Sequence, residues 1–244
     1  MPQAELKAEG WQLADATSLR LLEKLRQAGT PLGEYVNNRF YRGIVTGFNQ
    51  AFVVDKATRD RLIAEHPSSG EVLKPFLRGR DVKRWRVDYQ DLWLILTRRG
   101  TDIKNYPAIH DYLMLFKDRL TPGIPGGRKP GSYEWYEIQD NIAYWEEFER
   151  SKIFIPAIAQ SADYAADYSG YYGNDKTNIC VTDEVEFVLL HTETLPTLKD
   201  IQGDKLTALR AIFQRLYATD HPLRRNLFLL DTLPAIRIIE GKEV

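Results

Sequence analysis

The sequence has few of the residues on which covalent or metal-based chemistry is usually built. It contains one cysteine, Cys180, and four histidines in 244 residues. A single cysteine excludes an internal disulfide, and its place in the apolar run Asn178–Thr182 predicts a buried, inert thiol. No two histidines have the spacing of zinc ligands, so no metal site is predicted. This cysteine usage fits a reducing cytoplasm.

Long apolar segments are also missing. No run approaches the ~18 apolar residues that a membrane-spanning helix needs, and residues 1–7 lack the apolar stretch of a secretory signal. We therefore expect a cytoplasmic protein without a membrane partner. The composition, 43% hydrophobic and 27% charged, is typical of a globular chain that can bury a substantial core.

Motifs for catalysis are scarce. A methyltransferase centre needs a glycine-rich cofactor turn and an Asn-Pro-Pro-Tyr-type motif, and neither occurs, so no S-adenosylmethionine site or other cofactor is expected in this chain. The glycine-rich segment 123–131 is interrupted by prolines and is no phosphate loop. The pattern of a magnesium-dependent nuclease occurs once, in Asp231, Glu240 and Lys242. We favour the interpretation that these are ordinary charged residues near the end of the sequence, without a catalytic role.

Charge is unevenly distributed along a chain whose formal net charge is −1. Residues 78–104 contain eight Lys or Arg against four Asp or Glu, whereas residues 128–190 contain five against twelve. A locally basic face on a neutral protein can still attract nucleic acid. The alternative is ordinary solvated surface charge.

Two segments carry the most information. Gly43–Asp55 indicates a strand, a tight turn and a second strand, with Gly43 and Gly47 supplying unusual backbone angles. Asn and Gln side chains beside that turn can pair with adenine, or can merely satisfy turn backbone groups. Arg78–Arg86 then places five cationic side chains around Trp85, a combination typical of phosphate contact. We expect Trp85 to lie in the core or in a wall, and Trp93, which is part of an apolar strand, to lie in the core.

These segments belong to an ordered series that resembles a known family. The series comprises Gly43–Asp55, Glu71–Val82, Trp93–Ile95, Phe148–Pro156, Tyr171–Tyr172 and Thr177–Ile179. It resembles the TaqI-like specificity domain over residues 11 to 182. That domain is the target-recognition module of adenine-N6 DNA methyltransferases and of restriction enzymes that combine methylation with cleavage. The resemblance implies a mixed sheet with flanking helices that binds double-stranded DNA.

The periodicity of the sequence predicts the elements of an α+β fold. Helices are expected over 18–28, from an Asp55 cap to Ala64, over 69–73, from Pro107 to Leu120, and over 204–218. Strands are expected over 91–97, 152–158, 162–168, 177–182 and 235–239. The predicted domains are a DNA target-recognition domain over 11–190 and a C-terminal helical and strand appendage over 191–244.

A second basic patch is expected in the loop Thr121–Ser132. Its prolines and glycines favour no regular structure, so it is either a loop that orders on DNA or an ordinary surface loop. Together with the resemblance, the two patches give these candidate DNA-binding residues: Thr46, Asn49, Gln50, Arg78, Arg80, Lys83, Arg84, Arg86, Arg128, Lys129, Tyr133, Trp135, Tyr136 and Lys152.

The sequence thus predicts a double-stranded DNA recognition module of a restriction-modification system that is not itself catalytic. Its partner would be an adenine-specific methyltransferase domain, fused or separate, with or without a nuclease domain. Two alternatives stay open. One is a small-molecule enzyme with an aromatic pocket lined by the acidic residues Asp163, Asp167, Glu184 and Glu186; the other is an interaction module that no longer binds DNA.

Overall fold

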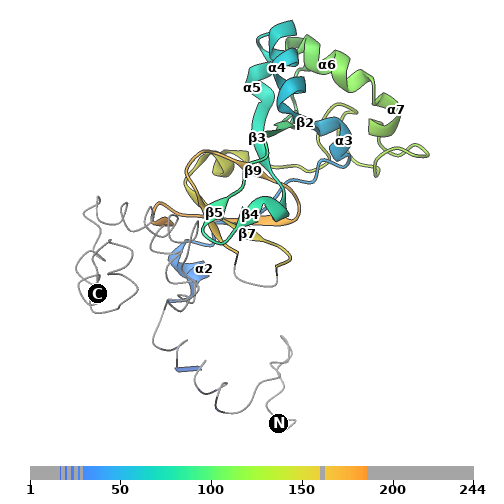
Figure 1. Cartoon of the computed structure of the whole chain (residues 1–244). Coiled ribbons are helices and arrows are strands. Elements are labelled where there is room, and N and C mark those ends of the chain that lie inside the picture. The colour runs from blue at the N-terminus through green and yellow to red at the C-terminus, as the bar shows by residue number, and fades with distance from the viewer. Residues whose placement is uncertain are drawn as a thin grey trace, which may run out of the picture. The chain divides into compact units, whose positions relative to one another are not determined.

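The computed structural model describes residues 17, 20, 23, 24, 27, 30–159 and 163–185. The chain divides into two compact units, Met1–Arg39 and Phe40–Val244 (Figure 1). In the first unit, the described residues of the predicted helix 18–28 are helical, and a short helix α2 spans Leu32–Tyr35. The predicted helix 204–218, the predicted strand 235–239, the predicted boundary near residue 190 and the residues Asp231, Glu240 and Lys242 all lie outside the described residues.

The second unit contains helices, one antiparallel and one mixed four-stranded sheet, and a two-stranded hairpin, which confirms the α+β class. One sheet has the order β1-β10-β7-β8 and is antiparallel throughout. Its strands are β1 (Phe40–Arg42), β7 (Lys152–Pro156), β8 (Ala165–Asp167) and β10 (Thr177–Val181). Strands β7, β8 and β10 lie within the ranges 152–158, 162–168 and 177–182 that the sequence predicted, and each is shorter than predicted.

The other sheet has the order β2-β6-β3-β9. Its first three strands are antiparallel, and β9 adds in parallel to β3. The strands are β2 (Val53–Asp55), β3 (Leu73–Leu77), β6 (Leu92–Ile95) and β9 (Tyr172–Gly173). A separate hairpin pairs β4 (Val82–Lys83) with β5 (Arg86–Val87).

Helices lie around the β2-β6-β3-β9 sheet at one end of this unit (Figure 1). Helix α4 (Lys56–Glu65) begins where the sequence predicted, because the Asp55 carboxylate accepts a hydrogen bond from Thr58 N at 2.8 Å. The predicted helix from Pro107 is divided near Leu115. The helical segments are α3 (Asn49–Phe52), α5 (Ser69–Val72), α6 (Pro107–Met114) and α7 (Lys117–Leu120), with 3-10 turns η2 (Gly79–Asp81), η3 (Ile103–Asn105) and η4 (Trp145–Glu149).

The segment Gly43–Asp55 is not the predicted strand-turn-strand unit. The strands before and after the turn belong to different sheets, and α3 lies between them. Gly47 does have a positive φ of 81°, as expected, but Gly43 does not. Gly43 is required for another reason: a Cβ there would lie 1.8 Å from the backbone oxygen of Asn174. This close approach joins the two sheets, and Ile44 N donates to Gly173 O at 2.8 Å at the same point.

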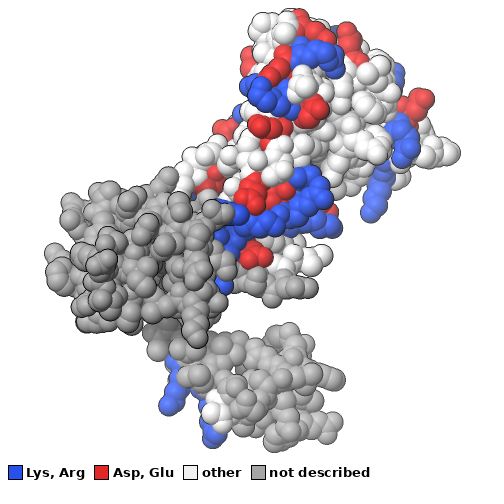
Figure 2. All heavy atoms as spheres, in the orientation of Figure 1, with Lys and Arg blue, Asp and Glu red and all other residues white. Residues whose placement is uncertain are grey.

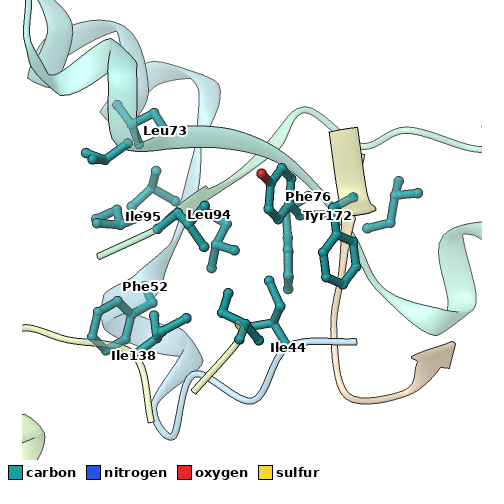
Figure 3. Packing of buried hydrophobic residues seen from close by; sticks show 14 of the residues in the cluster. Ile44, Phe52, Leu73, Phe76, Leu94, Ile95, Ile138 and Tyr172 are labelled. Carbon is teal, nitrogen blue, oxygen red and sulfur yellow. The ribbon is translucent and has the colours of Figure 1, made fainter. Parts of the chain in front are cut away.

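A single hydrophobic cluster fills the space between these elements. Figure 3 shows Ile44 and Tyr172 packed near Phe76, with Leu73, Leu94 and Ile95 from the second sheet beside them. Cys180 is buried in β10, as predicted. The helices of the described residues are all too short or too polar to span a lipid bilayer.

A buried ion pair links β7 to β8. Lys152 Nζ lies 2.5 Å from Asp167 Oδ2, and both side chains are fully buried. The carboxylate also accepts hydrogen bonds from Ser169 N and Tyr171 N, at 2.8 and 3.0 Å. The prediction that Lys152 contacts DNA is therefore wrong, because its ammonium group is enclosed between strands and bound to Asp167.

Replacing Lys152 with methionine should lower the free energy of unfolding by about 3–5 kcal/mol, because Asp167 would become a buried charge without a counterion. The double variant Lys152→Met/Asp167→Asn should recover part of this loss. Lys56→Met, which breaks the exposed Lys56–Asp60 pair, is the control and should leave stability unchanged. Urea unfolding measures all three; equal midpoints for Lys152→Met and Lys56→Met would contradict the expectation.

Candidate nucleic-acid interface

A groove of about 460 Å³ lies beside the β4–β5 hairpin. It brings Asn49, from α3, next to the basic stretch Arg78–Arg86, although the two segments are far apart in the chain. Figure 2 shows lysine and arginine side chains gathered in a band over the region of β4 and β5. The lining residues are Asn49, Arg78, Gly79, Arg80, Val82, Lys83, Pro156, Ile158, Ala159, Asp163, Asn174 and Lys176.

Arg78 shapes the wall of this groove. Its Nε and Nη2 atoms donate to the two oxygens of Asp81, each at 2.9 Å, and Asp81 also accepts from Arg78 N. The hydrogen bond to Asp81 raises the pKa of Arg78. Because Asp81 is buried, this bidentate pair fixes the η2 turn, and Arg78 presents only the rest of its guanidinium to the groove.

Arg80 and Lys83 differ from the other cations of the stretch. Both are exposed, and neither forms an ion pair or hydrogen bond through its side chain within the described part of the chain. By contrast, Arg86 Nε lies 3.1 Å from Asp88 Oδ1, and the Arg84 guanidinium stacks on Trp85 at 4.9 Å. Arg80 and Lys83 are therefore the two cations of the groove best placed to bind an anion.

Trp85 lies in the interior of the protein, one of the two positions that the sequence predicted for it. It is buried and has a positive φ of 68°, and its backbone N donates to Tyr164 O at 2.5 Å. Trp93 is half-buried, with the Arg59 guanidinium 4.2 Å from its ring centroid. Neither indole is placed to stack on a base.

The three polar candidates of the 43–55 segment have different positions. Asn49 and Gln50 are exposed at the start of α3, whereas Thr46 is buried. Thr46 Oγ1 accepts from Phe48 N at 3.2 Å and donates to Asn49 Oδ1 at 2.6 Å. The prediction that Thr46 contacts DNA is therefore wrong: its hydroxyl is used inside the turn.

Arg128 is a second correction. The sequence placed it on a flexible basic loop, but its side chain is 5% exposed. Its guanidinium donates to five backbone carbonyls, those of Leu120 (2.8 Å), Thr46 (3.0 Å), Glu137 (2.7 Å), Trp135 (2.8 Å) and Glu134 (3.4 Å). Burial lowers the pKa of Arg128 to about 10, so the group stays charged at neutral pH. It supports the loop from inside and has no surface to offer a phosphate.

The rest of the second patch stays at the surface. Lys129 is exposed, and Tyr133 packs against the guanidinium groups of both Arg99 and Arg128, at 4.8 and 4.7 Å. Trp135 is half-buried, with Lys117 Nζ 5.5 Å from its ring. Tyr133 and Tyr136 line a shallow hollow of about 700 Å³ with Arg99, apart from the groove residues. A DNA contact by Lys129, Tyr133, Trp135 or Tyr136 stays a prediction.

The acidic residues of the alternative enzyme reading do not gather around one pocket. Asp167 is buried with Lys152, and of the described acidic candidates only Asp163 lines the groove. Glu186 lies outside the described residues. Within those residues no group of three or more His, Cys, Asp or Glu side chains is arranged to hold a metal ion.

Sequence reasoning missed two residues of the groove. Asn174 Oδ1 accepts from Gly79 N at 3.1 Å and from Lys176 N at 3.2 Å, and so ties the η2 turn to the loop after β9. Lys176 adds an exposed cation, paired with Asp175 at 2.9 Å. The segment 173–175 was recognised only as a turn; an Asn that accepts from backbone amides is the usual chemistry of such turns.

Comparison with solved structures finds several chains of similar structure. No protein-family model and no curated protein matches the chain. It is similar to the Type IIL restriction-modification enzyme MmeI in complex with DNA, with a TM-score of 0.44 and 13% identity. The match covers 84% of this chain and 33% of that enzyme, so this chain spans about a third of its length.

Replacing Arg128 with lysine should destabilise the protein by about 3 kcal/mol or more, since each buried carbonyl left without a donor costs about 1–3 kcal/mol. Lysine keeps the charge but lacks the planar fork of five N–H groups. Thermal and urea unfolding of Arg128→Lys against Arg61→Lys, an exposed helix position, measures the difference. Equal stability of the two variants would mean that the carbonyls find other donors.

Proposed function

We propose that this chain recognises a specific sequence in double-stranded DNA and presents it to a methyltransferase. The observation that carries the proposal is the groove itself, where the predicted base-reading residue Asn49 meets the predicted phosphate-binding residues Arg78, Arg80 and Lys83. Residue types predicted separately from two segments thus share one concave surface. A small-molecule pocket receives no comparable support, because its predicted acidic residues are dispersed.

Two kinds of interaction are proposed for the groove: charge–charge contacts with phosphates and hydrogen bonds to base edges. Arg80 and Lys83 are exposed and unpaired within the described residues, so binding a phosphate breaks no existing ion pair. Contacts of this kind position a duplex without reading its sequence. Asn49 and Gln50 at the start of α3 are the groups that would reach a base edge.

The chemistry is proposed to reside elsewhere. In this proposal the chain works with an adenine-N6 methyltransferase domain, fused or separate, and in a cleaving enzyme also with a nuclease domain. S-adenosylmethionine would bind that partner domain. By holding the duplex, the module would support the partner while it turns an adenine out of the stack.

Charge reversal at Arg80 and Lys83 together should weaken binding to every duplex sequence by a similar factor and lower the slope of log K against log salt by about 1.8, because two phosphate contacts are lost. Fluorescence anisotropy across a salt series measures both quantities.

The matched control reverses two exposed lysines away from the groove, Lys56 and Lys104, which carry the same change in net charge. If both double variants lose affinity equally, only the net charge matters and the groove is not the interface. If the wild-type chain shows no affinity at low salt, the proposed DNA recognition is refuted, and the small-molecule enzyme and the interaction module without DNA binding are left as the two alternatives.

The purified chain should bind no S-adenosylmethionine and should not cut DNA in magnesium, since no catalytic motif other than the terminal one occurs. Calorimetry and a plasmid cleavage assay test this. Cleavage that disappears in Glu240→Gln or Lys242→Ala would assign a nuclease role to the C-terminal residues and overturn the non-catalytic reading.

A further inference from the structure

The turn before α3 fixes how Asn49 faces the groove. Thr46 is 2% exposed, and its hydroxyl has two neighbours in the turn, Phe48 N and the Asn49 side chain. Phe48 N can only donate, so the hydroxyl accepts from it. The single hydroxyl hydrogen must then go to Asn49, because a buried hydroxyl without an acceptor would cost free energy.

This assignment sets the orientation of the Asn49 amide. Only its oxygen can accept from Thr46, and the separation of 2.6 Å is that of an O–H···O hydrogen bond. The oxygen therefore faces the protein. The Nδ2 amino group is left without a partner among the described residues, at the rim of the groove that Asn49 lines.

The backbone of Thr46 is held just as firmly. Its carbonyl accepts from Arg128 Nη1 at 3.0 Å and from Gln139 N at 3.1 Å. These two hydrogen bonds fix the backbone that carries the Thr46 hydroxyl. The hydroxyl in turn orients the Asn49 amide before any ligand binds. Orienting a contact in advance avoids the cost of ordering it in the complex.

We propose that Asn49 acts as a donor-only reader of an acceptor-bearing base edge and that Thr46 is the positioning residue that makes it so. This rests on the proposed DNA-binding function. The purine and pyrimidine edges that present acceptors and no donor in the major groove are those of guanine (O6 and N7) and thymine (O4), whereas adenine presents its N7 acceptor beside the N6 donor. The bidentate contact to adenine needs the amide oxygen and nitrogen to face the base together, and Thr46 holds the oxygen away.

The test begins with selection of bound duplexes from a randomised library, using wild-type chain, Asn49→Asp and Thr46→Val. Asn49→Asp replaces the donor by an acceptor of the same shape. It should change the preferred base at one position from guanine or thymine to one that presents a donor, by on the order of tenfold. The other positions should keep their preferences.

Thr46→Val removes the hydroxyl and should relax the preference at that same position, while affinity for non-specific duplex stays within about twofold because phosphate contacts carry no sequence information. Thr46→Ser keeps the hydroxyl and should restore the preference. Unfolding curves identify loss of folded protein, and the serine variant keeps the test valid if the valine variant is unstable.

The outcomes separate the two proposals. A wild-type chain that does not bind duplex DNA refutes the proposed function and this inference with it. Salt-dependent binding without sequence preference, an adenine preference that depends on Asn49, or equal changes at all positions in Asn49→Asp would leave the proposed function standing and refute the role of Asn49 and Thr46.

Discussion

The buried guanidinium of Arg128 is the interaction on which the groove depends. A guanidinium has five N–H groups, and in this protein it meets five carbonyls, from the turn at Thr46, the end of α7 at Leu120, and three residues between Glu134 and Glu137. The backbone carbonyls of segments without regular structure have no helix or sheet hydrogen bonds. Burying these carbonyls without a donor would cost free energy. One charged side chain solves this for several segments at once, and so it also sets the position of the turn that holds Asn49.

The basic stretch shows a similar division between scaffold and surface. Arg78 is bound by Asp81, Gly79 N donates to Asn174, and Trp85, in the turn between β4 and β5, is buried. These contacts hold the backbone on either side of Arg80 and Lys83, whose side chains stay exposed. The five cations that look alike in the sequence therefore have different roles, decided by which of them has a neighbouring carboxylate or ring.

Local signals predicted local structure well. The Asp55 cap, Pro107 at the first turn of α6 and the apolar runs of β7 and β10 need only their neighbours in sequence to act. The errors concern partners from distant segments. Nothing near Arg128 shows that carbonyls from Thr46 and Glu137 will surround it, and nothing near Lys152 shows that Asp167 lies across the strand pair. Asn174 was missed for the same reason, because its side chain accepts a hydrogen bond from Gly79, which is distant in the sequence.

The small number of unpaired cations constrains how such a module can work. Arg80 and Lys83 are the clearest phosphate contacts of the groove. Each contact contributes about −0.9 to the slope of log K against log salt, so two contacts give a much shallower slope than the ten contacts of a strongly electrostatic DNA-binding protein. The two other cations that line the groove are already paired, Arg78 with Asp81 and Lys176 with Asp175. A module with so little non-specific affinity has two ways to hold DNA, namely directed base contacts and additional phosphate contacts from a partner domain. An oriented side chain such as Asn49 suits the first, because its contact brings discrimination without adding charge. The second way, additional phosphate contacts from a partner domain, suits a chain that acts only together with a catalytic partner. The weak binding of the module then leads to catalysis only where the partner is also bound.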